Sequence, residues 1–171
     1  MYDFDVLAVS ERDEVPEGGG SETGDVLRAA FDASITEIPR GPALTLAPET
    51  AVGTAVEAMR ARRRGTAIVL RNQRPVGVLT DRDILSRDGA LYGDLRSVPV
   101  GSVMSLCPEP LRLHDTVASA LKRMGAHRQW HLPIVCDRGL FLGALAATDI
   151  SLWLGDSLTH VSVEAFFAGR S

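Results

Sequence analysis

Thr80 and Asp83 have the residue types and spacing of an anion-binding corner. They follow the apolar run 76–79, where we expect a strand to turn into a helix. Free N–H groups at a helix start and the positive end of the helix dipole favour an anion. The Thr80 hydroxyl can donate to such a ligand, and the Asp83 carboxylate can accept from its hydroxyl groups. The same Thr-x-x-Asp spacing also forms a helix capping box, so the residue types leave both roles open.

Arginines lie on both sides of this corner. Arg60 and residues 62–64 are crowded at the end of the first long helix that the apolar spacing predicts. Cations there stabilise a helix C-terminus while staying solvated, or they attract a di- or triphosphate. Arg82 is nearer the corner and is the better single candidate for a phosphate contact. A nucleic-acid role for the cluster is disfavoured, because the net charge is -4 and nucleic-acid binders usually carry a basic excess.

The sequence contains no recognisable catalytic or metal-binding constellation. His127 and His131 are spaced i, i+4, which can present two imidazoles to one metal ion, but no third ligand is obvious nearby. Trp130 beside them is expected to cover the core rather than to serve as a platform on which a base stacks. There is no nucleophile elbow and no Walker lysine, and neither cysteine has a catalytic context. We therefore expect no enzyme activity, no metal site and no required cofactor.

The composition is that of a soluble globular chain. Of its 171 residues, 45% are hydrophobic, which is enough for a core without disulfides. Two cysteines are too few for a disulfide framework, so a cytoplasmic location is expected. No apolar run approaches the ~18 residues that span a bilayer, so no membrane segment is expected. Residues 1–24 are acidic and glycine-rich and are interpreted as a flexible leader.

Two copies of one unit follow this leader. The helical spacing i, i+3, i+4, i+7 recurs 65 residues later, where Val52, Ala55, Val56 and Met59 are followed by Val117, Ala120, Leu121 and Met124. Short apolar strands flank each helix at 44–46, 67–70 and 76–79, and again at 111–113, 133–136 and 142–145, with short helices from Asp81 and Thr148. The strands superpose with an offset of 66, and the approach to the first helix is two residues longer in the first copy. The order strand–helix–strand–strand–helix therefore occurs twice, which predicts an α/β (α+β) chain.

The repeat divides the chain into segments. We assign residues 25–88 to the first unit with a lead-in helix, and residues 89–155 to a linker and the second unit. Residues 156–171 form a C-terminal extension. Its late apolar residues indicate helix packing or a subunit interface.

The repeated unit resembles the cystathionine-β-synthase (CBS) domain family, as a tandem pair or Bateman module over roughly residues 35–154. The segment 77–85 reads Gly-Val-Leu-Thr-Asp-Arg-Asp-Ile-Leu and fits the Gly–apolar–x–Thr/Ser–x–x–Asp ending of the family. Further matches are Leu-Pro-Ile-Val at 132–135 and the lead-in Gly-Ser-Val-Met-Ser at 101–105. The resemblance implies two units packed as a pseudo-two-fold disc. It also implies up to two clefts between the units that bind AMP, ADP, ATP, S-adenosylmethionine or a related ligand, and no catalysis.

The resemblance also places the ligand contacts. In the first copy Asp83 would hold the ribose, and the base would lie against Thr45, Leu46, Thr66 and Ala67. Ala67 stands where the family has a proline, matched by Pro133 in the second copy. In the second copy Asp149 keeps the acidic position, but Ala146 replaces Thr80. His131 is retained as a contact near the base, and we expect one occupied cleft per chain.

The sequence thus favours a stand-alone regulatory module that senses an adenine nucleotide, forms a homodimer and signals to an effector protein. The alternative is a structural or protein-interaction module with degenerate clefts, for which Ala146 and Ala67 are the support.

Overall fold

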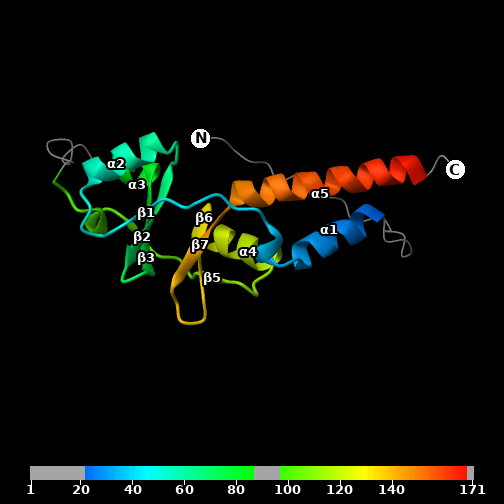
Figure 1. The fold of residues 1–171 in the computed structure, drawn as a ribbon, viewed down its shortest axis with the longest axis horizontal. Helices are drawn as coiled ribbons and strands as arrows, with labels where there is room; N and C mark the ends of the chain where they lie inside the picture. The colour runs from blue at the N-terminus through cyan, green and yellow to red at the C-terminus, as the bar shows by residue number, and fades with distance from the viewer. Residues whose placement is uncertain (1–21, 87–96, 169–171) are drawn as a thin grey trace, which may run out of the picture.

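The computed structural model describes residues 22–86 and 97–168, with the side chains described from residue 24 to residue 157. Two small sheets lie in the middle of an elongated body, with helices at both ends (Figure 1). The first unit contains β1 (Thr45–Leu46), α2 (Val52–Ala61), β2 (Thr66–Arg71), β3 (Arg74–Thr80) and α3 (Asp81–Ser86). The second contains β5 (Leu111–Arg112), α4 (Val117–His127), β6 (His131–Val135), β7 (Phe141–Ala146) and α5 (Ala147–Ala168). The predicted order strand–helix–strand–strand–helix is confirmed in both units.

Each sheet is built around an antiparallel hairpin with a short parallel strand on one side. β1 pairs parallel with β2, and β5 pairs parallel with β6. The β2–β3 hairpin closes through Asn72 and Gln73, which both have positive φ, as tight two-residue hairpin turns require. The second hairpin has a longer turn that contains Gly139 at φ +75°. The Gln73 carbonyl accepts the Phe141 N–H, so the two hairpins contact each other at their turns.

The lead-in segments before the two units are exchanged, which means that each one packs on the other unit. The first comprises α1 (Glu22–Asp32) and the short 3-10 helix η1 (Ile35–Glu37), and the second comprises the 3-10 helix η3 (Val100–Ser102) and β4 (Ser105–Leu106). The first segment packs on the second unit, where α1 lies beside α4 and α5 (Figure 1). The second segment packs on the first unit, where β4 becomes the fourth strand of the sheet β1-β2-β3-β4. A division of the chain in sequence order therefore differs from its division by packing.

Backbone hydrogen bonds make this exchange reciprocal. The N–H of Val52, at the start of α2, donates to the Val98 carbonyl, and the N–H of Val117, at the start of α4, donates to the Ala33 carbonyl. Helix N-termini leave their first N–H groups without intrahelical partners. In both units the lead-in of the other unit supplies the acceptor.

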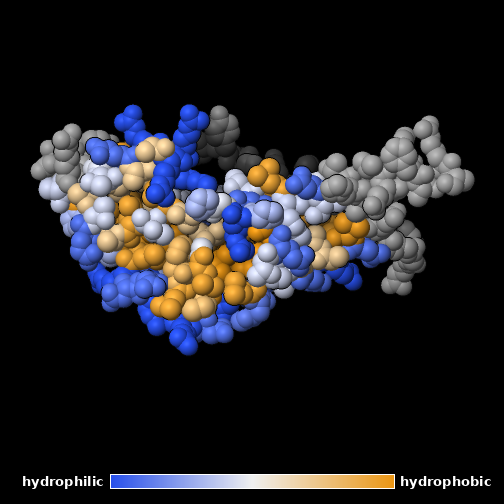
Figure 2. Space-filling view, viewed as in Figure 1, coloured by the Kyte–Doolittle hydropathy of each residue, from blue (hydrophilic) through white to orange (hydrophobic). Residues whose placement is uncertain are grey.

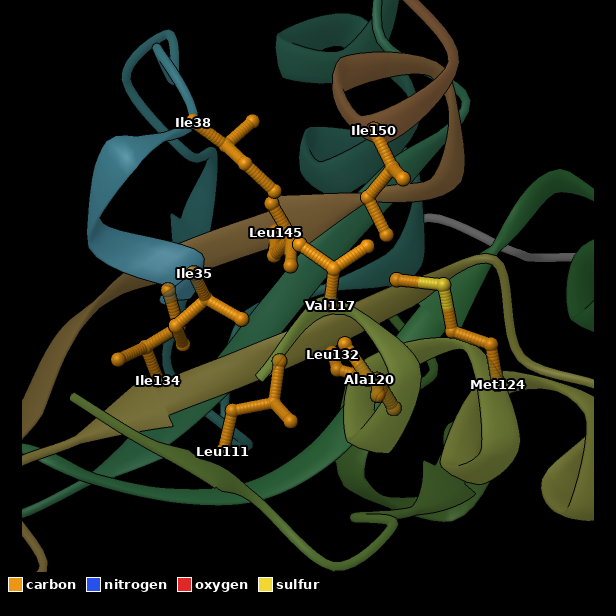
Figure 3. Packing of buried hydrophobic residues seen from close by; sticks show 10 residues of the cluster. All are labelled: Ile35, Ile38, Leu111, Val117, Ala120, Met124, Leu132, Ile134, Leu145 and Ile150. Carbon is orange, nitrogen blue, oxygen red and sulfur yellow. The ribbon is translucent and has the colours of Figure 1, made fainter. Parts of the chain in front are cut away.

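Two apolar cores follow from this arrangement. Figure 3 shows the second core, in which Ile35 and Ile38 from the lead-in meet side chains of β5, α4, β6, β7 and α5. The first core takes Val100 and Val103 from the other lead-in. Burying a side chain of this size stabilises the fold by about 1.5–3 kcal/mol, so each lead-in is part of the core that it covers.

The strand register corrects the predicted alignment of the two copies. Val69 lies opposite Gly77, and Ile134 lies opposite Gly143, so β2 maps onto β6 with an offset of 65 and β3 onto β7 with an offset of 66. The prediction of 66 for all strands was wrong by one residue at β2. The predicted extra length before the first helix is absent, because β1 and α2 also map with an offset of 65. The second hairpin turn contains the additional residue.

One consequence concerns the proline in the second copy. With the observed offset, Pro133 corresponds to Ile68, whereas Ala67 corresponds to Leu132. The predicted departure from the family at Ala67 was therefore a misalignment. Residues on the same face of a strand alternate, so a shift of one residue exchanges the two faces.

The predicted ends of the chain also change. α5 runs without a break from Ala147 to Ala168, so no boundary occurs at residue 156, and the closing helix of the second unit is not short. The predicted leader lies mostly outside the described residues, and α1 begins at Glu22, inside the assigned range 1–24. Among the described residues, no helix has both the length and the apolar character needed to cross a membrane.

Candidate functional site

Thr80 and Asp83 form a complete capping box at the start of α3. The Asp83 N–H donates to the Thr80 hydroxyl oxygen (3.1 Å), and the Thr80 N–H donates to Asp83 Oδ2 (2.8 Å). The Thr80 hydroxyl also donates to Oδ2 of Asp83 (2.6 Å). The capping interpretation of this pair is thus present in the structure. A ligand that contacts Thr80 or Asp83 would have to bind in addition to these capping hydrogen bonds.

Ser105 extends this corner from the other lead-in. Its hydroxyl donates to Asp83 Oδ1 (2.7 Å), so both carboxylate oxygens accept hydrogen bonds. The bond requires β4 to lie close to β3, and Gly77 permits that approach. A Cβ on Gly77 would overlap Met104 and would come within 2.8 Å of the Ser105 carbonyl oxygen. Gly77 therefore permits the close contact between the neighbouring strands β3 and β4.

A cleft opens between the two units above this corner. It has a volume of about 390 Å³, which is within the ~300–1,000 Å³ range of small-molecule sites. The structure brings five of the predicted site residues to this cleft: Thr66, Thr80, Arg82, Asp83 and His131. It adds others that the sequence reasoning did not select: Gly65, Asp81, Ser105, Arg128, Gln129 and Trp130.

Trp130 is the main addition. The prediction that it covers the core was wrong, because its side chain is 66% exposed and lines the cleft. It lies in the segment between α4 and β6, directly before His131. Its counterpart in the first unit is Gly65, since the Asp81 and Ala147 N–H groups bond to the carbonyls of Gly65 and Trp130 respectively. An exposed aromatic ring beside polar groups is suited to stacking against a planar ligand.

The charges in the cleft come from both units. Arg82 and Asp81 belong to α3, whereas Arg128 ends α4 in the left-handed conformation (φ 50°, ψ 36°). Asp81 already accepts the Arg82 N–H at Oδ1 (2.8 Å). Within residues 22–86 and 97–168, no ion pair involves Arg82 or Arg128. Both guanidinium groups are therefore available to a ligand anion.

A second, much smaller cleft is related to the first by the internal repeat. Its volume is about 40 Å³, far below that of a nucleotide site. Ala146 and Asp149 stand there in the places of Thr80 and Asp83, and Asp149 Oδ2 accepts the Ala146 N–H (2.9 Å). Arg64 also lines this cleft and packs so closely on Gly41 that a Cβ there would lie 2.9 Å from the guanidinium. The apolar Ala146 and the bulky Arg64 leave little space for a ligand.

Comparison with known proteins agrees with this architecture. A family model described as the CBS domain matches residues 35–89. The chain is a CBS-domain protein. A CBS domain protein from Pyrobaculum aerophilum, solved as a complex with AMP, is 26% identical, with a TM-score of 0.62 and coverage of 72% of this chain and 99% of that chain.

Two further solved structures show the same fold. A conserved CBS domain protein from Thermoplasma acidophilum is 21% identical, with a TM-score of 0.63 and coverage of 74% of this chain and 75% of that chain. A CBS-domain containing protein from Agrobacterium tumefaciens is 19% identical, with a TM-score of 0.59 and coverage of 70% and 97%. The likeness extends over both units, as a tandem CBS pair requires.

Thr66 and His131 occupy equivalent positions in the two CBS units and line both clefts. Burial lowers the pKa of His131 below its usual 6.5, and the positive charge of Arg64 lowers it further, while Asp149 opposes the shift. The neutral imidazole is thus favoured at the point where the clefts meet.

Three predicted base contacts lie outside the cleft of this CBS-domain protein. Ala67 is fully buried in the first core, because it points to the opposite face of β2 from Thr66. Leu46 packs against the same core, and Thr45 is exposed on β1 without lining either cleft. The one-residue error in register contributed to these assignments.

In the described part of the chain, no three His, Cys, Asp or Glu side chains are grouped to hold an ion. His127 is exposed at the end of α4, whereas His131 faces the clefts. Burial raises the pKa of the Cys107 thiol to about 11, so this thiol stays protonated and unreactive at neutral pH.

Proposed function

We propose that this CBS-domain protein is a non-catalytic regulatory module that binds an adenine nucleotide, or a related adenosyl ligand such as S-adenosylmethionine, in the larger cleft. The observation that carries the proposal is the 390 Å³ volume between the two units, with Trp130 exposed inside it and the Thr80–Asp83 corner at its wall. The AMP bound to the protein from Pyrobaculum aerophilum supports this ligand class.

Each part of a nucleotide has a matching group in the cleft. The base can stack on Trp130 beside His131, since stacking on an aromatic ring contributes about 1–3 kcal/mol per base. Asp83 can accept a ribose hydroxyl at Oδ1, where Ser105 occupies only one acceptor position. The phosphate can accept from Thr80 if its hydroxyl turns away from Asp83. The backbone bond from the Thr80 N–H to Asp83 would then keep the capping interaction.

Regulation follows from the position of the cleft. Because residues of both units line it, a ligand would bridge them and bias their relative position. We propose that an effector protein reads this bias, and that the chain forms a homodimer, the commonest oligomer. The cytoplasm remains the proposed compartment.

The test is a titration of the full chain with AMP, ADP, ATP, NAD, S-adenosylmethionine and GTP, by isothermal calorimetry and by tryptophan fluorescence. We expect an adenine ligand to bind and to quench Trp130, and Trp130→Ala to weaken binding about tenfold or more. Leu142→Ala is the matched control, because Leu142 is 53% exposed and does not line the cleft.

A second pair of variants separates the two clefts. Asp83→Asn is expected to weaken binding, and Asp149→Asn to leave it within about twofold, because only Asp83 lines the larger cleft. Absence of heat and of quenching with every adenine ligand, or equal losses for the two variants, would contradict the proposed site.

The second candidate function is a protein-interaction module without a ligand. It is favoured by exposed apolar side chains, among which Leu85, Leu106 and Leu152 are 71%, 84% and 71% exposed. Apolar side chains also gather on the face of the molecule in Figure 2. Equal thermal stability with and without every nucleotide, together with a change of oligomeric state in Leu85→Lys, would favour this function.

A further inference from the structure

Two arginines that line the larger cleft come from different units. Arg82 lies in the first turn of α3, and Arg128 is the residue that ends α4. The backbone N–H of Arg128 bonds to the carbonyls of Met124 and Gly125, so the position from which its side chain starts is fixed. Both side chains are exposed and line the same cleft.

The acidic groups beside these arginines are already engaged by other donors. The Asp83 oxygens accept from Thr80 and Ser105, and Asp81 accepts the Arg82 backbone N–H. Neither guanidinium forms an ion pair in the described chain, although carboxylates line the same cleft. Two unpaired cations facing one cleft from separate units favour an anion that can reach both.

The internal repeat provides a comparison for this pair of arginines. Arg63 is the counterpart of Arg128 and has the same backbone conformation, with φ 51° against 50°. Arg63 instead lines a separate groove between α2 and α3, together with Arg60 and Arg64 from the same unit. In the second unit the counterpart of Arg82 is Thr148, which carries no charge. Among the described residues, arginines of both units line the larger of the two repeat-related clefts, whereas Arg64 is the one arginine that lines the smaller cleft.

We propose that Arg82 and Arg128 form a clamp that selects ligands by the length of their phosphate chain, so that nucleoside di- and triphosphates bind more tightly than monophosphates. This inference rests on the proposed nucleotide function and deepens it. A single phosphate near Thr80 contacts Arg82 alone, whereas a longer chain extends across the cleft to Arg128. Each further charge-assisted contact strengthens binding by about tenfold. Because the clamp joins the two units, a long phosphate chain also holds them together.

The experiment compares AMP, ADP and ATP, and phosphate with tripolyphosphate, on the full chain by isothermal calorimetry. Arg128→Asn removes the charge with a residue that tolerates the left-handed conformation. Arg63→Asn is the matched control, since it makes the same change at the equivalent helix end outside the cleft. Arg82→Gln tests the other side of the clamp.

We expect the affinity to rise from AMP to ATP, and to fall more steeply with salt for ATP. Arg128→Asn should weaken ATP about tenfold, leave AMP within about twofold and abolish binding of tripolyphosphate, while Arg63→Asn changes none of these. Equal affinity for AMP and ATP, or equal losses in the two asparagine variants, would overturn the clamp and leave the nucleotide site standing. Binding of tripolyphosphate without any nucleotide would support the clamp and overturn the nucleotide function. Failure of every ligand to bind would overturn both.

Discussion

The two clefts share Thr66 and His131 but differ in volume, at about 390 Å³ and 40 Å³. Their backbones are closely equivalent, because the hydrogen bonds that hold the exchanged lead-ins recur with an offset of 65 residues. The difference therefore lies in side chains. Trp130 and Gln129 line the large cleft. Their counterparts in the first unit are Gly65 and Arg64, and the Arg64 side chain lies in the small cleft. The two units thus share one backbone arrangement, and differences in a few side chains leave space for a ligand in only one of the two clefts.

The edges of the two sheets differ for a related reason. β4 adds to the first sheet, where the Cys107 N–H donates to the Val76 carbonyl. The residue equivalent to Cys107 in the first lead-in is Pro42, which has no N–H to donate. In the described chain the second sheet accordingly has three strands. The additional strand is what brings Ser105 to Asp83, so the larger cleft depends on a lead-in that its counterpart cannot reproduce.

The largest effect is expected from breaking the exchange of lead-ins. Ile35→Ala should lower the free energy of unfolding by about 2–5 kcal/mol, because Ile35 is fully buried in the second core although it precedes the first unit. Urea denaturation measures the loss. Hydrogen exchange should then increase in β6 and β7 more than in β2 and β3.

The matching variant in the other lead-in is Val100→Ala, since Val100 is fully buried in the first core. It should increase exchange mainly in β2 and β3. If both variants loosened the same sheet, the lead-ins would not be exchanged in solution.

A smaller effect is expected from a pair of glycines. Gly77→Ala should cost about 1–3 kcal/mol, because the new methyl group would press on Met104 and on the Ser105 backbone and displace β4. Gly143→Ala should be tolerated, because nothing lies within 4 Å of a Cβ there. Unfolding in urea compares the two variants directly. Equal stability would show that the fourth strand does not press on Gly77.

The sequence was sufficient for the order of elements and for part of the site. Two periodic helices and paired apolar runs identify a repeat without tertiary information, and Thr80 and Asp83 are placed by the strand end that they follow. The register of β2 was not accessible, because consecutive apolar residues fit either face of a buried strand equally well. The exchange of lead-ins is a long-range contact and leaves no local pattern. Trp130 was wrongly assigned to the core, because the sequence does not distinguish an exposed aromatic side chain from a buried one.

The smallest effect is a dependence of stability on pH at His131, where the two clefts meet. In the folded chain the pKa of His131 is lowered from 6.5 by burial and by Arg64, against the attraction of Asp149. Well above pH 6.5 the imidazole is neutral in both the folded and the unfolded chain, so it adds no slope. Below that pH the unfolded chain binds a proton that the folded chain resists, and the free energy of unfolding falls as the solution is acidified.

Variants at His131, Arg64 and Asp149 test this dependence of stability on pH. Urea denaturation from pH 8 to about 5 should give a shallower slope for Arg64→Gln, since removal of the cation lets the pKa of His131 rise toward its usual value. Asp149→Asn should steepen the slope, because the opposing attraction is lost, and His131→Gln should remove this contribution. Each variant is compared with the wild type at pH 8 to subtract its effect on the neutral state. Slopes that are unchanged in all three variants would mean that His131 titrates as a solvated residue, in which case the clefts do not meet at a buried imidazole.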